Sequence, residues 1–182
     1  MQQIDTLTSQ TSLLVAEEPK WYAVHVRSRH EFQVFERLSM KGVEAFLPTV
    51  EKLSRWKDRR KKVVFPLFPG YLFVHVPKKS KEKLNVLKIK GVVRLLSSVP
   101  NEPDPIPDDQ IISLKKLVEN KEALDPYPYL SEGQRVRINI GPLRGVEGIL
   151  IEKLGKHMLV ISVDVLRQGV AVTISASDVE KI

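Results

Sequence analysis

The hydrophobic positions of residues 21–120 follow two different periods. Residues 21–27 and 71–76 alternate apolar and other side chains with the period of two that is typical of β-strands. Residues 29–41 and 108–120 repeat apolar positions at the three- and four-residue spacing that is typical of helices. The remaining elements predicted here are extended chain at 45–53, a short helix at 80–90 and a strand at 92–96.

Both longer predicted helices carry one apolar face and a terminal signal. The core-facing positions are Phe32, Val34, Phe35 and Leu38 in the first, and Ile111, Leu114, Leu117 and Val118 in the second. Gly42 follows the first helix in the position that commonly ends a helix. Asp108 or Asp109 is expected to cap the second, because a short acidic side chain accepts hydrogen bonds from free backbone N–H groups.

Residues 132–182 change to a different pattern. Short β-branched runs lie at 135–140, 148–152, 158–163 and 170–174, separated by glycine-containing turns. This spacing predicts a small barrel of antiparallel strands, and the β-branched composition disfavours helices. The predicted organisation is a disordered polar leader at 1–19, a domain at 20–120, a proline-stiffened linker at 121–131 and a second domain at 132–182.

The composition narrows the classes of protein. The absence of cysteine excludes disulfides, iron–sulfur clusters and thiol nucleophiles, and it fits a reducing cytoplasm. The chain has no apolar run long enough to span a membrane and no signal peptide, so we expect a cytoplasmic protein. The four histidines have no metal-binding spacing, and no phosphate loop, dinucleotide fingerprint or serine elbow is present. We therefore expect no enzymatic activity, no catalytic residue, no metal and no cofactor.

The net charge of +7 is unevenly distributed. Residues 21–130 hold 21 Lys and Arg against 13 Asp and Glu, whereas residues 131–182 hold 7 against 6. The densest basic stretch is RWKDRRKK at 55–62, which we interpret as the tip of a hairpin. Such a cationic loop can follow phosphates, and Trp56 can stack on an unpaired base. The alternative is a solvated turn with Trp56 folded into the core.

Nine residues are candidates for nucleic-acid binding. They are Arg55, Trp56, Lys57, Arg59, Arg60, Lys61 and Lys62 in this stretch, and Arg27 and Arg29 after the first strand. Arg27 and Arg29 are almost equally well explained as charges at the start of a helix.

The strand at 71–76 has two distinct faces. Leu72, Val74 and Val76 lie on one face, which suits a core beneath helices, and Tyr71, Phe73 and His75 lie on the other. The second face is either an exposed docking patch or the other side of a fully buried central strand. The alternation alone slightly favours the buried strand.

Residues 135–148 read RVRINIGPLRGVEG and predict a hairpin. One strand ends at Gly141 and Pro142, and a second begins near Gly148. The glycines at 141, 145 and 148 indicate positive φ angles or close backbone approach.

Two stretches together resemble the NusG family of transcription factors. The WYAV of 21–24 with Arg27 and Glu31, the FLP of 46–48 and the PLFPGYLFV of 66–74 are similar to its N-terminal domain. The glycine hairpin at 133–148 and the DVEKI of 178–182 are similar to the KOW domain that follows. The resemblance covers residues 20–182 in the order of the family.

The resemblance implies an α+β N-terminal domain, with an antiparallel sheet flanked by helices, and an all-β, SH3-like C-terminal barrel. It implies docking on the clamp helices of the largest subunit of RNA polymerase through Tyr71 and Phe73. The basic residues would then contact DNA of the elongation complex, and bridging clamp and DNA would suppress pausing. The residues matching the KOW motif are Gly141, Pro142, Leu143, Gly145 and Gly148.

The C-terminal part departs from the housekeeping member of the family. Leu166-Arg167-Gln168 stands where that pattern has Phe-Gly-Arg, and Leu143 stands where it has an aromatic residue. The departures indicate a specialised paralogue that promotes antitermination of particular operons. Leu166 and Arg167 remain weak candidates for contact with the ribosome or another protein. We expect a monomer.

The alternative is a KOW-domain RNA-binding protein of the ribosome or of RNA maturation. Such a protein would carry its basic excess in the KOW domain, whereas residues 131–182 are almost neutral.

Overall fold

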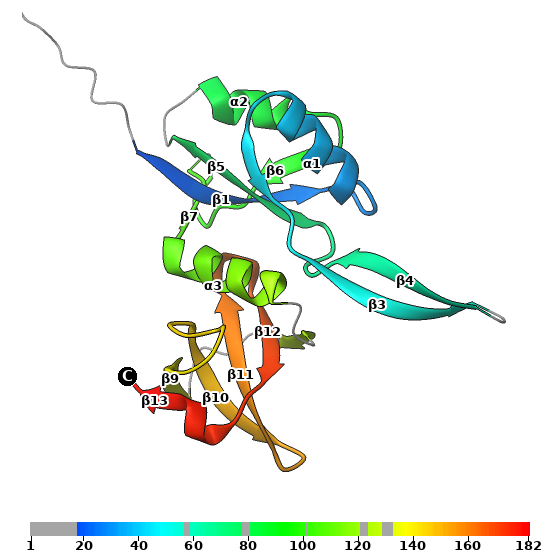
Figure 1. The fold of residues 1–182 in the computed structure, drawn as a ribbon. Coiled ribbons are helices and arrows are strands. Elements are labelled where there is room, and N and C mark those ends of the chain that lie inside the picture. The colour runs from blue at the N-terminus through cyan, green and yellow to red at the C-terminus, as the bar shows by residue number, and fades with distance from the viewer. Residues whose placement is uncertain (1–17, 57–58, 78–80, 101, 121–123, 129–132) are drawn as a thin grey trace, which may run out of the picture.

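The computed structural model describes residues 18–56, 59–77, 81–100, 102–120, 124–128 and 133–182 (Figure 1). Residues 1–17, most of the predicted leader, lie outside the described residues. The first strand already begins at Pro19.

The N-terminal part is built on a 5-stranded antiparallel sheet. Its strands are β1 (Pro19–Val26), β2 (Glu44–Phe46), β5 (Tyr71–Pro77), β6 (Val92–Leu95) and the short β7 (Pro105–Ile106). They pair in the order β2-β5-β1-β6, with β7 also on β1. Helices α1 (Glu31–Met40) and α2 (Lys81–Leu87) lie on one face and α3 (Asp108–Glu119) on the opposite face (Figure 1). The α+β architecture expected for this part is observed.

The two faces of β1 and β5 enter two separate hydrophobic clusters. Leu72, Val74 and Val76 pack with Tyr22, Val24 and Val26 beneath α1 and α2. Phe73 lies with Trp21 and Ala23 in the cluster that contains the apolar stripe of α3. Because successive side chains of a strand point to opposite faces, the alternation predicted both sets correctly.

Helix α1 differs from the prediction at one face position. Val34 and Leu38 are buried as expected, but Phe32 is 42% exposed and Glu31 is buried instead. Glu31 tolerates burial because its carboxyl oxygen accepts a hydrogen bond from the Gly70 N–H at 2.7 Å. Gly42 follows with φ +70, as the sequence predicted.

Helix α3 carries the predicted stripe but not the predicted cap. Ile111, Leu114 and Leu117 are buried. The N-cap residue is Pro107, without a side-chain cap hydrogen bond, so the expectation of an Asp108 or Asp109 cap was wrong. Both aspartates lie in the first turn, where a negative charge interacts favourably with the helix dipole.

Strands β3 (Thr49–Trp56) and β4 (Arg59–Pro66) form a separate 2-stranded ribbon. It projects away from the rest of the molecule (Figure 1). The basic stretch was expected at a loop, but Arg55, Trp56 and 59–62 belong to the paired strands. Lys57 lies outside the described residues. The described residues of the stretch therefore belong to the ribbon.

The C-terminal part is a 6-stranded antiparallel sheet in the order β13-β9-β10-β11-β12-β8. Its strands are β8 (Asp125–Pro128), β9 (Gln134–Ile138), β10 (Glu147–Lys153), β11 (Lys156–Val163), β12 (Gln168–Thr173) and β13 (Val179–Lys181). Strand β8 pairs with β12, so part of the segment interpreted as a linker belongs to this sheet. The observed region is all-β, as predicted.

Helix α3 lies between the two sheets (Figure 1). Its stripe shares one hydrophobic cluster with residues of β9, β11 and β12 as well as with β1 and β5. Two hydrogen bonds add to this contact: Gln110 Nε2 donates to Asp164 Oδ2 at 2.9 Å, and Lys116 Nζ donates to the Arg144 carbonyl oxygen at 2.9 Å. The helix thus binds both parts of the chain.

Candidate functional site

The second face of β5 forms an aromatic cluster. Phe73 is fully buried, with the Phe68 ring edge-on and the Phe46 ring stacked, both at 6.1 Å between centroids. Tyr71 is only partly buried, and its ring centre lies 5.2 Å from that of His25. The pair therefore combines one sealed aromatic ring with one that solvent still reaches.

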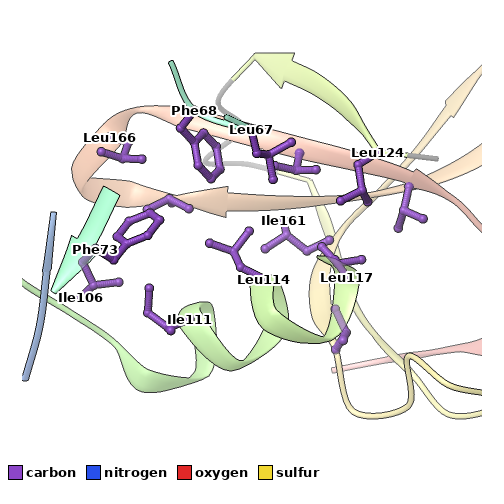
Figure 2. Packing of buried hydrophobic residues seen from close by; sticks show 14 of the residues in the cluster. Leu67, Phe68, Phe73, Ile106, Ile111, Leu114, Leu117, Leu124, Ile161 and Leu166 are labelled. Atoms are coloured by element: carbon purple, nitrogen blue, oxygen red, sulfur yellow. The ribbon is translucent and has the colours of Figure 1, made fainter. Parts of the chain in front are cut away.

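The cover over Phe73 comes from distant parts of the chain. Figure 2 shows Phe73 among Phe68, Ile106, Ile111 and Leu166, which come from the N-terminal part, from α3 and from the turn before β12. The idea of an exposed docking patch therefore fails for Phe73 in this structure. Periodicity cannot distinguish an exposed apolar face from a second buried face when the covering residues are far away in sequence.

The turn that leads into β5 contributes two further buried residues. Leu67 and Phe68 are each 2% exposed and belong to the same cluster as Phe73. The Leu67 N–H donates to the Pro48 carbonyl oxygen at 2.8 Å, which ties the turn to the base of the ribbon. The sequence predicted no burial for 66–70, which entered only as part of the PLFPGYLFV motif. The apolar pair between Pro66 and Pro69 was the available signal that these residues belong to the aromatic face.

An open cavity of about 600 Å³ reaches Tyr71 from the side. Its walls include Arg94 of β6, Gln110 of α3 and Leu166 and Arg167 of the C-terminal part. Tyr71 is therefore accessible at the junction of the two parts even while Phe73 is covered.

A polar and aromatic network holds α3 near the other end of this face. His75 Nδ1 lies 2.7 Å from Glu44 Oε2, and the His75 ring stacks on Trp21 at 4.7 Å. Lys115 of α3 lies 3.9 Å from Glu44 Oε1 and 4.6 Å above the Trp21 ring. A cation above an indole face adds attraction to the ion pair, so this network helps to keep α3 in place.

The ribbon of β3 and β4 presents a high density of basic positions. Its register places Arg55 opposite Arg60 and Trp56 opposite Arg59. Lys62 pairs with Glu51 at 3.5 Å, but both side chains are more than half exposed, so the pair contributes little. Directly opposed like charges destabilise a ribbon, and a bound polyanion would relieve that repulsion.

Arg27 and Arg29 are exposed in the loop between β1 and α1. The Val26 N–H donates to the Gly70 carbonyl oxygen at 2.8 Å, so this loop starts beside the turn at the base of the ribbon. Arg29 has a φ of +63, which is uncommon for a residue other than glycine.

The glycine hairpin of the C-terminal part packs against α3. Leu143 is 6% exposed and joins the cluster with Phe73. Gly141 and Gly145 have φ angles of +80 and +85, whereas Gly148 has backbone so close that an added Cβ would lie 2.5 Å from the Val160 oxygen. Pro142 is exposed at the turn. Gly141 and Gly145 therefore provide positive φ angles and Gly148 allows close backbone approach, the two roles that the sequence suggested.

The two weaker candidates differ in accessibility. Leu166 is 7% exposed and faces the aromatic cluster, whereas Arg167 is exposed with a φ of +52. Leu166 therefore contributes to the contact between the two parts in this structure.

Within the described ranges, no group of three or more His, Asp and Glu side chains gathers as metal ligands would. None of the helices described is both long enough and apolar enough to cross a bilayer.

A protein-family model matches the N-terminal part of the chain. Residues 19–115 match the family model described as "Transcription termination factor nusG".

Curated relatives carry a consistent description. The protein from Vibrio vulnificus is 28% identical over 181 residues, which covers 92% of this chain and 100% of the relative. The protein from Escherichia coli strain K12 is 26% identical over 180 residues, which covers 92% of this chain and 99% of the relative. Both are described as "Transcription termination/antitermination protein NusG".

A solved structure shares the fold. It is described as "Domain interaction in Thermotoga maritima NusG", and it aligns with a TM-score of 0.54 at 23% identity. The alignment covers 91% of this chain and 98% of the other.

Proposed function

Because the chain belongs to the NusG family of transcription termination and antitermination factors, we propose that it binds transcribing RNA polymerase and changes how the enzyme passes terminators. The N-terminal part docks on the clamp helices of the largest subunit through the face of Tyr71 and Phe73. The basic ribbon, with Arg27 and Arg29, contacts DNA of the elongation complex. Holding clamp and DNA together raises processivity and suppresses termination, and it needs neither a catalytic residue nor a cofactor.

The observation that carries the proposal is the direct link between the aromatic face of β5 and the basic ribbon of β3 and β4. The link is both covalent and hydrogen-bonded. Strand β4 of the ribbon runs through the turn at 66–70 into β5, and both ends of that turn are fixed by backbone hydrogen bonds. A protein partner on the β5 face is therefore held at a defined position relative to an anionic partner on the ribbon. Aromatic rings and arginines are also the residue types that dominate binding energy at protein interfaces.

Docking through Phe73 requires a change from the structure described. Helix α3 and the C-terminal sheet cover this ring, so a partner helix reaches it only after that cover moves. Tyr71 remains accessible at the open cavity and provides a first contact. The related Thermotoga maritima structure is also described by a domain interaction. The covered state would keep an apolar face out of water until polymerase is present.

For the C-terminal part we propose an SH3-like barrel of the KOW type. The antiparallel path from β13 to β8 and the glycine hairpin support this interpretation. The domains would be 20–120 and 132–182, with β8 completing the second sheet. Leu143 and Leu166 stand where the housekeeping member carries other residues, which favours a specialised paralogue that acts on particular operons. The protein would act as a cytoplasmic monomer.

The ribosomal alternative has less support. The family match lies in the N-terminal residues 19–115, and residues 131–182 remain almost neutral. Ribosomal RNA binding through the C-terminal part would need an excess of cations there.

The proposal is tested by capture and transcription. Tagged protein should retain core RNA polymerase from a native lysate, and it should increase read-through of a terminator in a reconstituted transcription reaction. Capture of ribosomes without polymerase, or unchanged read-through on templates from the native operons of the source organism, would contradict it.

A further inference from the structure

Glu31 is a buried acidic residue that the proposed docking does not use. It is 5% exposed, although acidic side chains are almost never buried without a partner. Its Oε1 accepts a hydrogen bond from the Gly70 N–H at 2.7 Å. This distance is typical of hydrogen bonds to a charged acceptor, which are stronger than those between neutral groups.

The position of Glu31 favours this contact. It is the first residue of α1, where the free N–H groups of the helix attract negative charge. Gly70 has a φ of +84, so the turn takes a conformation that other residues rarely adopt. Glycine adopts this conformation readily, and Glu31 adds a side-chain contact to its N–H.

Gly70 is central to the connection between ribbon and docking strand. Its carbonyl oxygen accepts from the Val26 N–H at 2.8 Å, and the next residue, Tyr71, donates its N–H to the Phe68 carbonyl oxygen at 3.1 Å. The turn therefore joins β1, the aromatic face and the end of the ribbon at one point. A shift of Gly70 would move Phe68 and Tyr71 relative to the basic strands.

We propose that Glu31 is a positioning residue, which sets the geometry of the two partner surfaces by holding the Gly70 turn. The inference rests on the proposed function for its partners, but the hydrogen bond itself is independent of them. Glu31 touches neither polymerase nor DNA in this scheme and acts only through the turn.

The test compares Glu31→Ala, which removes the acceptor, with Glu31→Gln, which keeps an oxygen at nearly the same place. Glu36→Ala, an exposed glutamate on the same helix, is the matched control. The rate of hydrogen exchange at the Gly70 amide, measured in the full chain, shows whether its hydrogen bond to Glu31 is formed. The affinity for core RNA polymerase shows whether losing that bond impairs docking. Thermal unfolding of each variant shows whether the chain is folded during both measurements.

In Glu31→Ala, we expect the Gly70 amide hydrogen to exchange at least about tenfold faster than in the unaltered protein. The exchange rate of the Val160 amide in β11 serves as the internal reference. Its affinity for polymerase should fall by about tenfold while the protein remains folded. Glu31→Gln should restore both values to within about threefold of the original, and Glu36→Ala should change neither. If Glu31→Ala does not fold, Glu31→Asp, whose carboxyl is withdrawn by one methylene, should show the same two changes.

Three results would overturn the inference. One is unchanged Gly70 exchange in Glu31→Ala. Another is faster exchange with full polymerase affinity. The third is weak binding by Glu31→Gln although Gly70 stays protected, since the charge would then matter more than the position. Failure of the unaltered protein to bind polymerase would instead contradict the proposed function, and Gly70 exchange would still decide whether Glu31 holds the turn.

Discussion

At the scale of single residues, Tyr71 and Phe73 show how neighbouring positions on one face take different roles. Phe73 is packed on all sides, whereas Tyr71 borders an open cavity. The same substitution therefore tests stability at one position and binding at the other. This difference has to be considered before any loss of polymerase binding is assigned to either ring.

Phe73→Ala should lower the free energy of unfolding by about 3–5 kcal/mol, because it removes a fully buried ring and leaves a cavity. Tyr71→Ala should destabilise less and weaken polymerase binding by more than about 2 kcal/mol if Tyr71 is a hot spot. Chemical denaturation and a binding titration separate the two effects. Unchanged affinity of a folded Tyr71→Ala variant would remove Tyr71 from the site.

The glycines of the C-terminal hairpin should also respond differently. Gly148→Ala places a Cβ 2.5 Å from the Val160 carbonyl oxygen, so β10 and β11 must separate. Gly141→Ala meets no atom of the described residues within 4 Å, so the unfavourable feature is its φ of +80. We expect losses of about 3 kcal/mol or more for Gly148→Ala and about 1–2 kcal/mol for Gly141→Ala, measured by denaturation. Equal losses would show that steric contact does not dominate at Gly148.

At the scale of secondary-structure elements, the ribbon of β3 and β4 lacks the support that stabilises most strands. Isolated two-stranded hairpins are marginal in water, and this one projects away from both sheets (Figure 1). At its base, Val50 packs against the main cluster. Opposed arginines at 55 and 60 further weaken it. A ribbon of this kind would gain stability from a bound polyanion.

Replacing Lys61 and Lys62 by Gln should reduce the salt dependence of binding to an elongation complex. Each lost phosphate contact lowers the slope of log affinity against log salt by about 0.9, so two contacts lower it by about 2. The matched control replaces Lys156 and Lys181 of the C-terminal sheet, which are exposed and far from the ribbon in sequence. An identical slope in both variants would mean that the ribbon is solvated and not bound to DNA.

At the scale of the whole molecule, α3 determines whether the aromatic face is available. It contacts the N-terminal sheet through Lys115 and the C-terminal part through Gln110 and Lys116. The Gln110 Oε1 is buried and has no hydrogen-bond partner among the described residues, so the junction with the C-terminal part contains an unpaired polar atom. An imperfect junction favours a cover that a partner can displace.

The double variant Gln110→Ala with Lys116→Ala should bind polymerase more tightly. Losing two hydrogen bonds weakens the contact between α3 and the C-terminal part by about 1–2 kcal/mol. The population in which the C-terminal part has moved off the aromatic face then rises about five- to thirtyfold if the packed state predominates. Affinity for core polymerase measures this change, with Glu119→Ala, exposed on the same helix, as control. Weaker or unchanged binding would show that the cover does not limit docking.

The sequence by itself determined the elements and their faces. The strand alternation at 21–27 and 71–76, the stripe of α3 and the β-rich C-terminal runs were predicted correctly, because local periodicity reflects which side of an element is apolar. The motif PLFPGYLFV, together with the glycine hairpin, was sufficient to indicate the family. These signals lie within short segments, so no distant contact was needed to recognise them.

Only the tertiary structure decided what those faces contact. It placed α3 and Leu166 over Phe73, moved β8 from the predicted linker into the second sheet, and buried Glu31 against Gly70 in place of Phe32. Each of these depends on residues that are far apart along the chain. A strand carries no local record of whether water or another element lies beyond its side chains, so burial on a second face is settled only when the whole chain packs.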